Sequence, residues 1–199
     1  DVQELDEDYA IVATGATPKR LPVQGFKRAM DALDYLDGAK VGQRVVVIGG
    51  GLTGCEVALE LYLSGKEPVI VEMKDDLVAA PDGVCLANSS YLREFFAWKK
   101  VPVYLESTVR AIGEDWVQIS HKDGTLERIA CDSVVSAVGY TPDPISQPDG
   151  RHVQLVGDCA GVGNLRSVIW RAYEAASRVY WGNHEKEGRP AHGADPGGA

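Results

Sequence analysis

The chain has 199 residues and an excess of acidic side chains, which gives it a formal net charge of −9 at pH 7. This balance argues against a nucleic-acid partner, because neutralising phosphates requires basic patches and none is visible in the sequence. No apolar run approaches the roughly 20 residues of a membrane span, and no charged-then-apolar signal segment opens the chain. A chain with these features that does not begin with Met is expected to be a cytoplasmic protein or a piece of a longer one.

Short apolar runs bounded by glycine and proline predict the first elements. A buried strand is expected over 9–13, and the glycine and proline within 14–18 stop it. Residues 19–40 are expected to form a connection with one short helix.

The clearest pattern in the sequence comes next. A β-branched run over 44–48 predicts a strand buried on both faces, and 52–64 predicts a nearly apolar helix that ends at Gly65. A second buried strand is expected over 68–72. Strand, helix and strand together predict a parallel crossover unit.

After this unit the apolar pattern changes. A second helix is expected over 86–99 and a strand over 101–105. Alternating apolar residues and short turns then predict an antiparallel three-stranded meander. Its strands are expected over 108–112, 116–120 and 126–129. A further buried strand over 133–138 is stopped by glycine and proline within 139–142.

The last predicted elements are a strand over 153–156 and, after a glycine-containing loop, a helix over 165–181. Apolar residues at helical spacing predict the face by which this helix packs. That face consists of Leu165, Val168, Ile169, Ala172, Ala176 and Val179. The tail over 188–199 is rich in Gly, Pro and Ala and is predicted to be disordered.

Four cysteines are spread along the chain. They are Cys55, Cys85, Cys131 and Cys159. No two form a CxxC pair, so neither a structural zinc site nor a paired redox dithiol is expected. All four are expected to be buried, reduced thiols, and the sequence predicts no metal site.

The glycine cluster after the first crossover strand carries the strongest functional signal. Gly49, Gly51 and Gly54 have the GxGxxG spacing and lie between a predicted strand and a predicted helix. In such a unit the first glycine permits the tight turn, the second lets a pyrophosphate approach the backbone, and the third allows close helix–strand packing. Free N–H groups at the helix start attract phosphates. This pattern predicts a dinucleotide site.

Two acidic residues accompany this motif. Glu72 ends the second strand, 18 positions after Gly54, where a carboxylate can bind the adenosine ribose hydroxyls. It would repel a 2′-phosphate and so favours NAD(H) over NADP(H), although the nearby Lys74 weakens that preference. The alternative is a solvated carboxylate at the strand end. Glu56 either complements the helix dipole from the first turn or lies near the nicotinamide.

Three further motifs surround the glycine cluster in a recognisable order. Val-Ala-Thr-Gly-Ala-Thr-Pro over 12–18 resembles the ATG motif of two-dinucleotide-binding flavoprotein reductases, and Ser-Ala-Val-Gly-Tyr-Thr-Pro over 136–142 resembles their second such motif. Leu-Val-Gly-Asp-Cys-Ala over 155–160 resembles the motif whose Asp binds the flavin ribityl chain. The resemblance covers about residues 9–181. It implies an α/β fold, with a Rossmann-like parallel sheet and an antiparallel three-stranded meander.

Within that superfamily the chain is most similar to the C-terminal flavin-reductase half of NADH:flavin oxidoreductases of the old yellow enzyme type. This group includes the 2,4-dienoyl-CoA reductases and relatives of trimethylamine dehydrogenase. The matching residues lie in 13–19, 31–36, 46–56 and 156–159.

The resemblance implies which residues bind each cofactor and names no catalytic side chain. Residues of the nicotinamide nucleotide site would be Gly49, Gly51, Gly54, Glu56 and Glu72. Residues of the FAD site would be Thr14, Gly15, Gly157 and Asp158. Gly139 would lie at the hinge between the domains, close to NAD(H). The implied reaction is hydride transfer from NADH to FAD, with electrons passing on to an iron–sulphur cluster and FMN in a barrel domain.

The chain has no second GxGxxG unit, so its FAD domain is expected to be incomplete. The expected organisation is a partial FAD segment over 1–40, an NAD(H) domain over 41–139, a second partial FAD segment over 140–187, and the tail. The expected partners are a nicotinamide nucleotide, the barrel and the remaining FAD-domain segments of the same enzyme. The piece alone is expected to bind FAD weakly or not at all.

Two alternatives to a hydride-transferring domain stay open at this point. The same glycine turn would serve a non-catalytic module that holds ADP or NAD as a structural ligand. A disulfide reductase is the other alternative, and the lack of a paired-cysteine motif counts against it.

Overall fold

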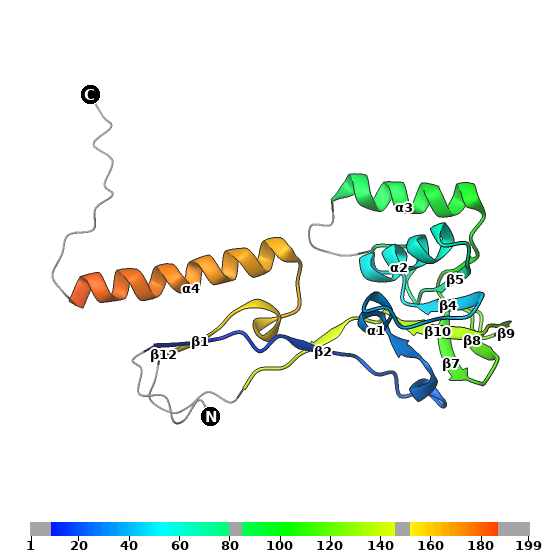
Figure 1. Cartoon of the computed structure of the whole chain (residues 1–199), viewed down its shortest axis with the longest axis horizontal. Helices are drawn as coiled ribbons and strands as arrows, with labels where there is room; N and C mark the ends of the chain where they lie inside the picture. The colour runs from blue at the N-terminus through cyan, green and yellow to red at the C-terminus, as the bar shows by residue number, and fades with distance from the viewer. Residues whose placement is uncertain (1–8, 80–84, 146–151, 187–199) are drawn as a thin grey trace. The chain divides into compact units, whose positions relative to one another are not determined.

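The computed structural model describes residues 9–79, 85–145 and 152–186 (Figure 1). The chain divides into two compact units. The larger spans 18–139, and the smaller takes its residues from 1–17 and 140–199. The predicted disorder of the tail lies outside the described residues.

A five-stranded parallel sheet forms the centre of the larger unit, with strand order β3-β10-β4-β5-β6. The strands are β3 (Met30–Asp31), β10 (Ser133–Ser136), β4 (Arg44–Ile48), β5 (Glu67–Val71) and β6 (Val103–Tyr104). The helices are α1 (Ala32–Leu36), α2 (Leu52–Leu63) and α3 (Leu86–Lys99). The predicted crossover unit is therefore confirmed as β4-α2-β5. Gly65 follows α2 with a φ of 76°, the left-handed conformation typical of a residue that ends a helix.

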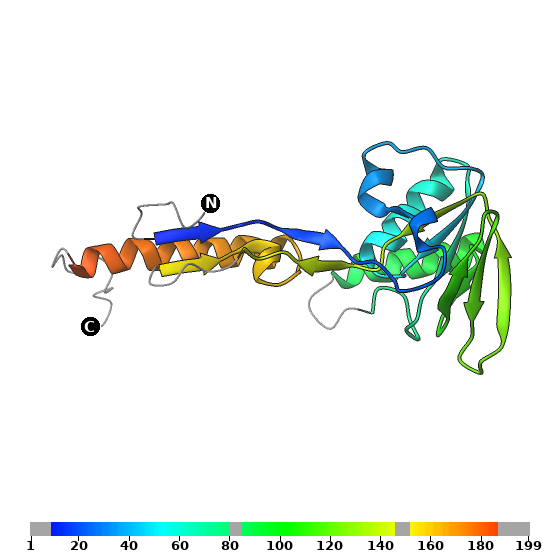
Figure 2. The same cartoon turned by 90° about the horizontal axis from the view of Figure 1, so that it is seen from below.

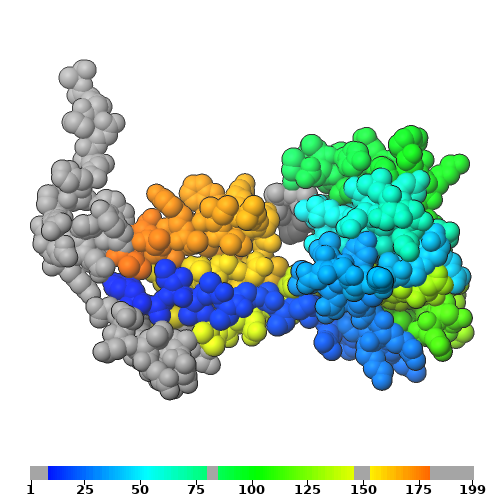
Figure 3. Space-filling model, viewed as in Figure 1, coloured from blue at the N-terminus to red at the C-terminus, as the bar shows by residue number. Residues whose placement is uncertain are grey.

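Both faces of this sheet are buried, as the unbroken apolar run of β4 predicts. Val45 and Val47 belong to a core that includes residues of α2 and α3, whereas Val46 and Ile48 belong to a second core with the meander. Figure 1 shows the two helices on one side of the sheet, and in Figure 3 their cyan and green surfaces cover that side of the unit. The meander itself is confirmed as antiparallel. Its strands are β7 (Thr108–Ile112), β8 (Trp116–Ser120) and β9 (Leu126–Ala130).

The larger unit begins at Pro18 and not at residue 41. Strand β3 joins the sheet through Met30 and Asp31, which pair with β10, and Gln24 bridges to Ala111 of β7. A strand of two residues has no alternation that sequence reasoning could detect. Strands β6 and β10 are also shorter than predicted, and β5 begins and ends one residue earlier.

The smaller unit contains a parallel pair of strands and one long helix (Figure 2). Its elements are β1 (Tyr9–Val12), β12 (His152–Leu155), the short 3-10 helix η3 (Gly157–Ala160) and α4 (Leu165–Lys186). The segments predicted only to stop strands form a second pair, β2 (Ala16–Pro18) with β11 (Tyr140–Pro142). A 3-10 turn, η2 (Phe26–Arg28), lies in the larger unit.

The predicted packing face of α4 is only partly correct, because its Val168 and Val179 are half-buried whereas its other four residues are exposed. Leu165 is 76% exposed and Ile169 is 58% exposed, whereas Ala175 is buried and Val168 is half-buried. Trp170 is also exposed. Because α4 carries apolar residues around much of its circumference, periodicity alone does not fix which of them face the strands. The helix also runs five residues past its predicted end at 181.

Three of the cysteines are buried, and all four are free thiols. The expectation is wrong for Cys85, which is exposed immediately before α3. In the described ranges no helix is long and apolar enough to cross a membrane. Nor do the described residues place three or more His, Cys, Asp or Glu side chains where they could hold a metal ion.

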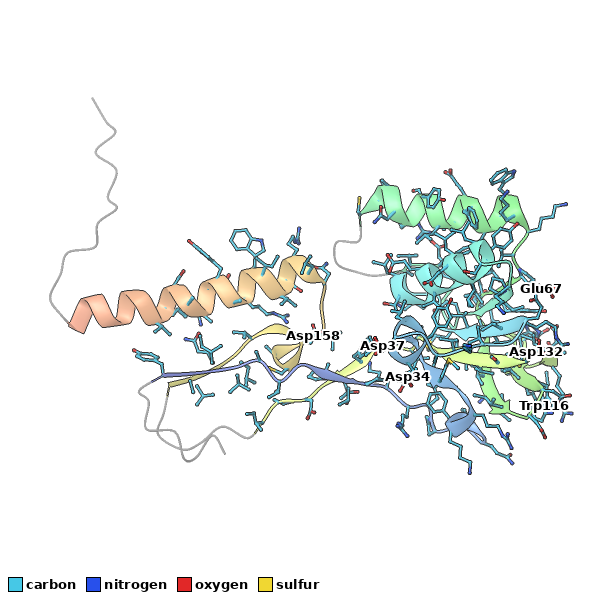
Figure 4. All side chains as sticks on the ribbon, viewed as in Figure 1. Asp34, Asp37, Glu67, Trp116, Asp132 and Asp158 are labelled. Atoms are coloured by element: carbon cyan, nitrogen blue, oxygen red, sulfur yellow. The ribbon has the colours of Figure 1, made fainter. Side chains whose placement is uncertain are left out.

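One ion pair fixes the start of β4 and provides a test of the fold by pH. The Asp132 carboxylate (labelled in Figure 4) accepts hydrogen bonds from the backbone N–H groups of Gln43 and Arg44 and from the Arg44 guanidinium. These bonds lower the pKa of Asp132 to about 2. Because the carboxylate is favoured in the folded state, its stabilising effect is present above the unfolded pKa of about 3.9 and lost as the pH falls toward 2.

We therefore expect Asp132→Asn to lose less stability than the wild type between pH 4 and pH 2. Urea unfolding across this range measures the difference, and NMR titration of the Asp132 carboxyl carbon measures its pKa directly. A titration midpoint near 4 would contradict this account of the bonded carboxylate.

Candidate functional site

The glycine turn lies at the carboxyl end of β4, directly before α2. Gly49 has a φ of 105°, and its N–H donates to Val71 O at 2.9 Å. A Cβ at Gly49 would lie 2.4 Å from Ala137 O, and one at Gly54 would lie 1.9 Å from Gly49 O. The chain's own packing therefore requires glycine at both positions.

Gly51 differs from its neighbours in the turn. Its φ of −68° suits any residue, and a Cβ there would meet no atom within 4 Å. Among the glycines whose surroundings the structure describes, Gly51 alone combines a negative φ with open space. The described residues also provide no acceptor for its N–H. Gly51 thus leaves the space in front of the turn clear and carries an N–H that no described residue accepts.

The start of α2 provides further donors. Gly51 is the N-cap residue, and no side chain caps the helix. The first intrahelical hydrogen bond of α2 runs from Cys55 N–H to Gly51 O at 2.9 Å. Backbone N–H groups before that bond have no intrahelical acceptor, and together with the helix dipole they favour an anion such as a phosphate.

Glu72 lies beneath the turn and is only 8% exposed. Its Oε2 accepts a hydrogen bond from Gly50 N–H at 2.5 Å, and its Oε1 accepts one from Lys74 N–H at 2.8 Å. The alternative of a solvated strand-end carboxylate is therefore wrong. Each carboxylate oxygen has a second lone pair, so these bonds leave acceptor positions for another donor. The Lys74 ammonium donates to Ala79 O at 2.6 Å.

Glu56 lies one turn further into α2 than expected. The first turn of the helix contains no acidic residue, and Glu56 is exposed. Complementing the dipole from the first turn is therefore not its role, because that effect fades beyond one turn.

The candidate FAD residues belong to the smaller unit, where the carboxyl ends of β1 and β12 meet. Val12 pairs with Leu155, so Thr14 and Gly157 each follow their strand by two residues. The Thr14 hydroxyl donates to Asp143 O at 2.5 Å, and Asp143 N–H donates to Gly15 O. Asp158 (labelled in Figure 4) is half-buried and accepts one bond, from Gly163 N–H at 3.2 Å. Gly139, in the larger unit, has a φ of 90°, and its carbonyl accepts Lys19 N–H.

Sequence reasoning missed a polar cluster beside β6 and the meander. His121 Nε2 lies 2.9 Å from Glu127 Oε2, its Nδ1 lies 3.2 Å from Ser107 Oγ, and Tyr104 donates to Glu127 at 2.8 Å. The Ser–His–Glu order resembles a hydrolase triad. However, Ser107 is 1% exposed and its hydroxyl donates to Leu105 O, so it is no accessible nucleophile. The cluster ties β9 to the segment after β6, and its members have no motif spacing that could have revealed it.

Comparison with known proteins agrees with this geometry. Residues 1–155 match the pyridine nucleotide-disulphide oxidoreductase family. Cinnamate reductase of Clostridium sporogenes is 33% identical over 184 residues, which cover 90% of this chain and 28% of that protein. NADH oxidase of Thermoanaerobacter brockii is 29% identical over 198 residues, which cover 89% and 29%.

Solved structures give the same result. A 2-naphthoyl-CoA reductase in complex with 2-naphthoyl-CoA superposes with a TM-score of 0.72 and 29% identity, over 84% of this chain and 26% of that one. Thioredoxin reductase of T. acidophilum shares the fold with a TM-score of 0.68 and 23% identity, over 88% and 66%. The chain spans less than a third of the length of the two curated relatives above. The chain therefore belongs to the pyridine nucleotide-disulphide oxidoreductase family, whose members are flavoproteins with FAD and pyridine nucleotide sites.

Proposed function

We propose that the unit over 18–139 binds NAD(H) at the Gly49–Gly54 turn, as the pyridine nucleotide domain of a larger NADH:flavin oxidoreductase. The observation that carries this proposal is Gly51, whose open surroundings and free N–H have no explanation among the residues that the structure describes. A pyrophosphate needs both features, because its oxygens must come within hydrogen-bond distance of the backbone. The N–H groups at the start of α2 would hold the same group.

The acidic residues would set the orientation of the nucleotide. Glu72 would accept the adenosine ribose hydroxyls on the lone pairs that Gly50 and Lys74 leave unused. Its negative charge would disfavour a 2′-phosphate, so NADH is the proposed donor in preference to NADPH. Glu56 would lie toward the nicotinamide end of the site.

The smaller unit would contribute one edge of an FAD site. Within the described residues the Asp158 carboxylate accepts a single bond, from Gly163 N–H, so it retains acceptor capacity for hydroxyls such as those of a ribityl chain. Thr14, Gly15 and Gly157 would line the same strand ends. When bound, FAD supplies the ring system that accepts a hydride from NADH. The rest of the FAD domain, and a barrel with FMN and an iron–sulphur cluster of the old yellow enzyme type, would come from other segments of the same enzyme.

The relatives support an electron-transfer role of this kind. One of them is a NADH oxidase and two others are a cinnamate reductase and a bilirubin reductase. If the nucleotide were instead a structural ligand, NADH would leave the flavin of the full-length protein oxidised. Bleaching of the flavin absorbance by NADH supports hydride transfer.

The cofactor preference provides the direct test of the site. We expect the wild-type chain to bind NADH more tightly than NADPH. Glu72→Ala should lower the ratio of the NADPH dissociation constant to the NADH dissociation constant by about tenfold, the effect of removing one charge near the 2′-phosphate. This ratio is informative because a loosened glycine turn would weaken the binding of NADH and of NADPH alike. Fluorescence titration with both nucleotides measures it, and Glu72→Gln removes the charge while keeping the side-chain volume.

Failure of the wild-type chain to bind either nucleotide would refute the proposed site. An unchanged ratio in both variants would instead show that another residue, such as Lys74, determines the preference.

A further inference from the structure

A turn on the far side of Glu72 holds the glycine motif in place. Val78 N–H donates to Gly50 O at 2.7 Å, and Leu77 packs so closely that a Cβ on Gly50 would lie 2.6 Å from Leu77 Cδ2. Glu72 holds the Gly50 N–H from its other side. Gly50 is therefore held at its N–H, at its carbonyl oxygen and at its Cα.

The orientation of Gly50 O determines that of the Gly51 N–H. Both groups belong to one planar trans peptide unit, in which the C=O and the N–H point in opposite directions. Because the Val78 N–H at 2.7 Å, together with the Cys55 thiol at 3.4 Å, holds this carbonyl, the Gly51 N–H must point away from the 76–78 turn. That N–H is the donor for which the described residues provide no acceptor.

The turn that makes this contact is not a relaxed one. Val78 is 4% exposed and has a φ of 51°, a left-handed conformation that is an outlier for a β-branched residue. Such a conformation persists only where the surrounding contacts enforce it. An enforcing contact therefore has to come from outside the turn.

Arg93 of α3 provides that contact. Its Nη2 donates to Leu77 O at 2.6 Å, and its Nε and Nη2 each lie 2.9 Å from one oxygen of Asp76. The Asp76 carboxylate also accepts Leu77 N–H at 2.8 Å. The planar guanidinium thus holds a side chain and a backbone carbonyl of the turn together, a geometry that a lysine cannot reproduce.

We propose that Arg93 is a positioning residue of the nucleotide site, which holds the Asp76–Val78 turn against Gly50 and so aims the Gly51 N–H at the pyrophosphate. This inference rests on the proposed function, because the Gly51 N–H matters only if a nucleotide binds there. Arg93 itself needs no contact with the ligand.

The test is Arg93→Gln in the 199-residue chain, read by NADH titration and by hydrogen exchange at individual amides. We expect the NADH dissociation constant to rise about tenfold, the cost of losing one hydrogen bond to a charged group, and the Val78 N–H to lose hydrogen-exchange protection while the amides of β4 keep theirs. Both effects should be intermediate in Arg93→Lys, because lysine keeps the positive charge but lacks the planar guanidinium that donates to two groups at once.

Arg44→Gln is the matched control. Arg44 also makes a two-point ion pair with an aspartate, Asp132, but at the opposite end of β4 from the glycine turn. Arg44→Gln should leave both NADH affinity and the hydrogen-exchange protection of the Val78 N–H unchanged. NADH affinity in Arg93→Gln within twofold of wild type would overturn the proposal.

The two proposals can fail separately. If wild-type chain binds no NADH, the proposed function falls and the role of Arg93 in binding falls with it. If wild type binds NADH but Val78 stays fully protected in Arg93→Gln, the anchoring role of Arg93 is refuted and the proposed function stands.

Discussion

Gly51→Val should abolish NADH binding while the chain stays folded. The two γ-methyl groups would occupy the space in front of the turn, where no atom of the described residues lies within 4 Å of a Cβ built on Gly51. The pyrophosphate would lose several backbone hydrogen bonds, each worth about 1.5–3 kcal/mol to a charged group, so affinity should fall by about 100-fold or more. Since φ is −68°, the substitution strains no backbone. Fluorescence titration with NADH measures the loss.

Gly51→Ser is the sharper companion variant. Gly51 is the N-cap of α2, and serine is among the preferred residues at that position because its hydroxyl bonds the N–H groups of the first turn. Those N–H groups are the ones proposed to bind the pyrophosphate. Gly51→Ser should therefore preserve or raise the melting temperature and still weaken NADH binding. If both variants bind NADH as wild type does, the open space at Gly51 serves no nucleotide.

The parts of the fold that sequence reasoning predicts are those with a strong local signal. The apolar run of β4 between a charged start and a glycine cluster requires a strand buried on both faces, and Gly65 marks the end of α2. The meander has regular alternation and short turns. In each case a few consecutive residues carry all the information needed.

The remaining features depend on contacts between distant residues. Strand β3 has two residues and exists only because β10 lies beside it. The exposure of Ile169 and the burial of Ala175 depend on which side of α4 meets the strands. In a helix with apolar residues on several sides, the sequence leaves that choice open.

The candidate site divides in the same way. The spacing of Gly49, Gly51 and Gly54 is local, and their positions follow from it. The burial of Glu72 and the role of Arg93 are not local, because the carboxylate is held by a backbone N–H 22 positions earlier and the guanidinium reaches a turn 16 positions away. No pattern in the sequence indicates that an arginine in mid-helix touches Leu77.

Gly54→Ala should destabilise the larger unit although it removes no contact and only adds a methyl group. The added Cβ would lie 1.9 Å from Gly49 O, 3.0 Å from Gly49 C and 3.3 Å from Ala137 Cβ. The nearest atoms are backbone, so α2 must move away from β4 and open the core between them. Overpacking of this kind costs about 1–3 kcal/mol and more where backbone has to shift, so we expect about 3 kcal/mol or more.

Gly54→Ala and Gly51→Ala form a matched pair within one turn, since each adds the same methyl group to the same motif. Thermal unfolding should show a fall of about 10 °C for Gly54→Ala. The fall should be small for Gly51→Ala, because its methyl group meets open space and it loses only the modest preference for glycine over alanine at an N-cap. NADH titration should rank the two in a different way, with Gly51→Ala impaired at temperatures where it is fully folded. Equal melting temperatures would mean that α2 can shift freely on β4, and the packing explanation for the third glycine of the motif would then be wrong.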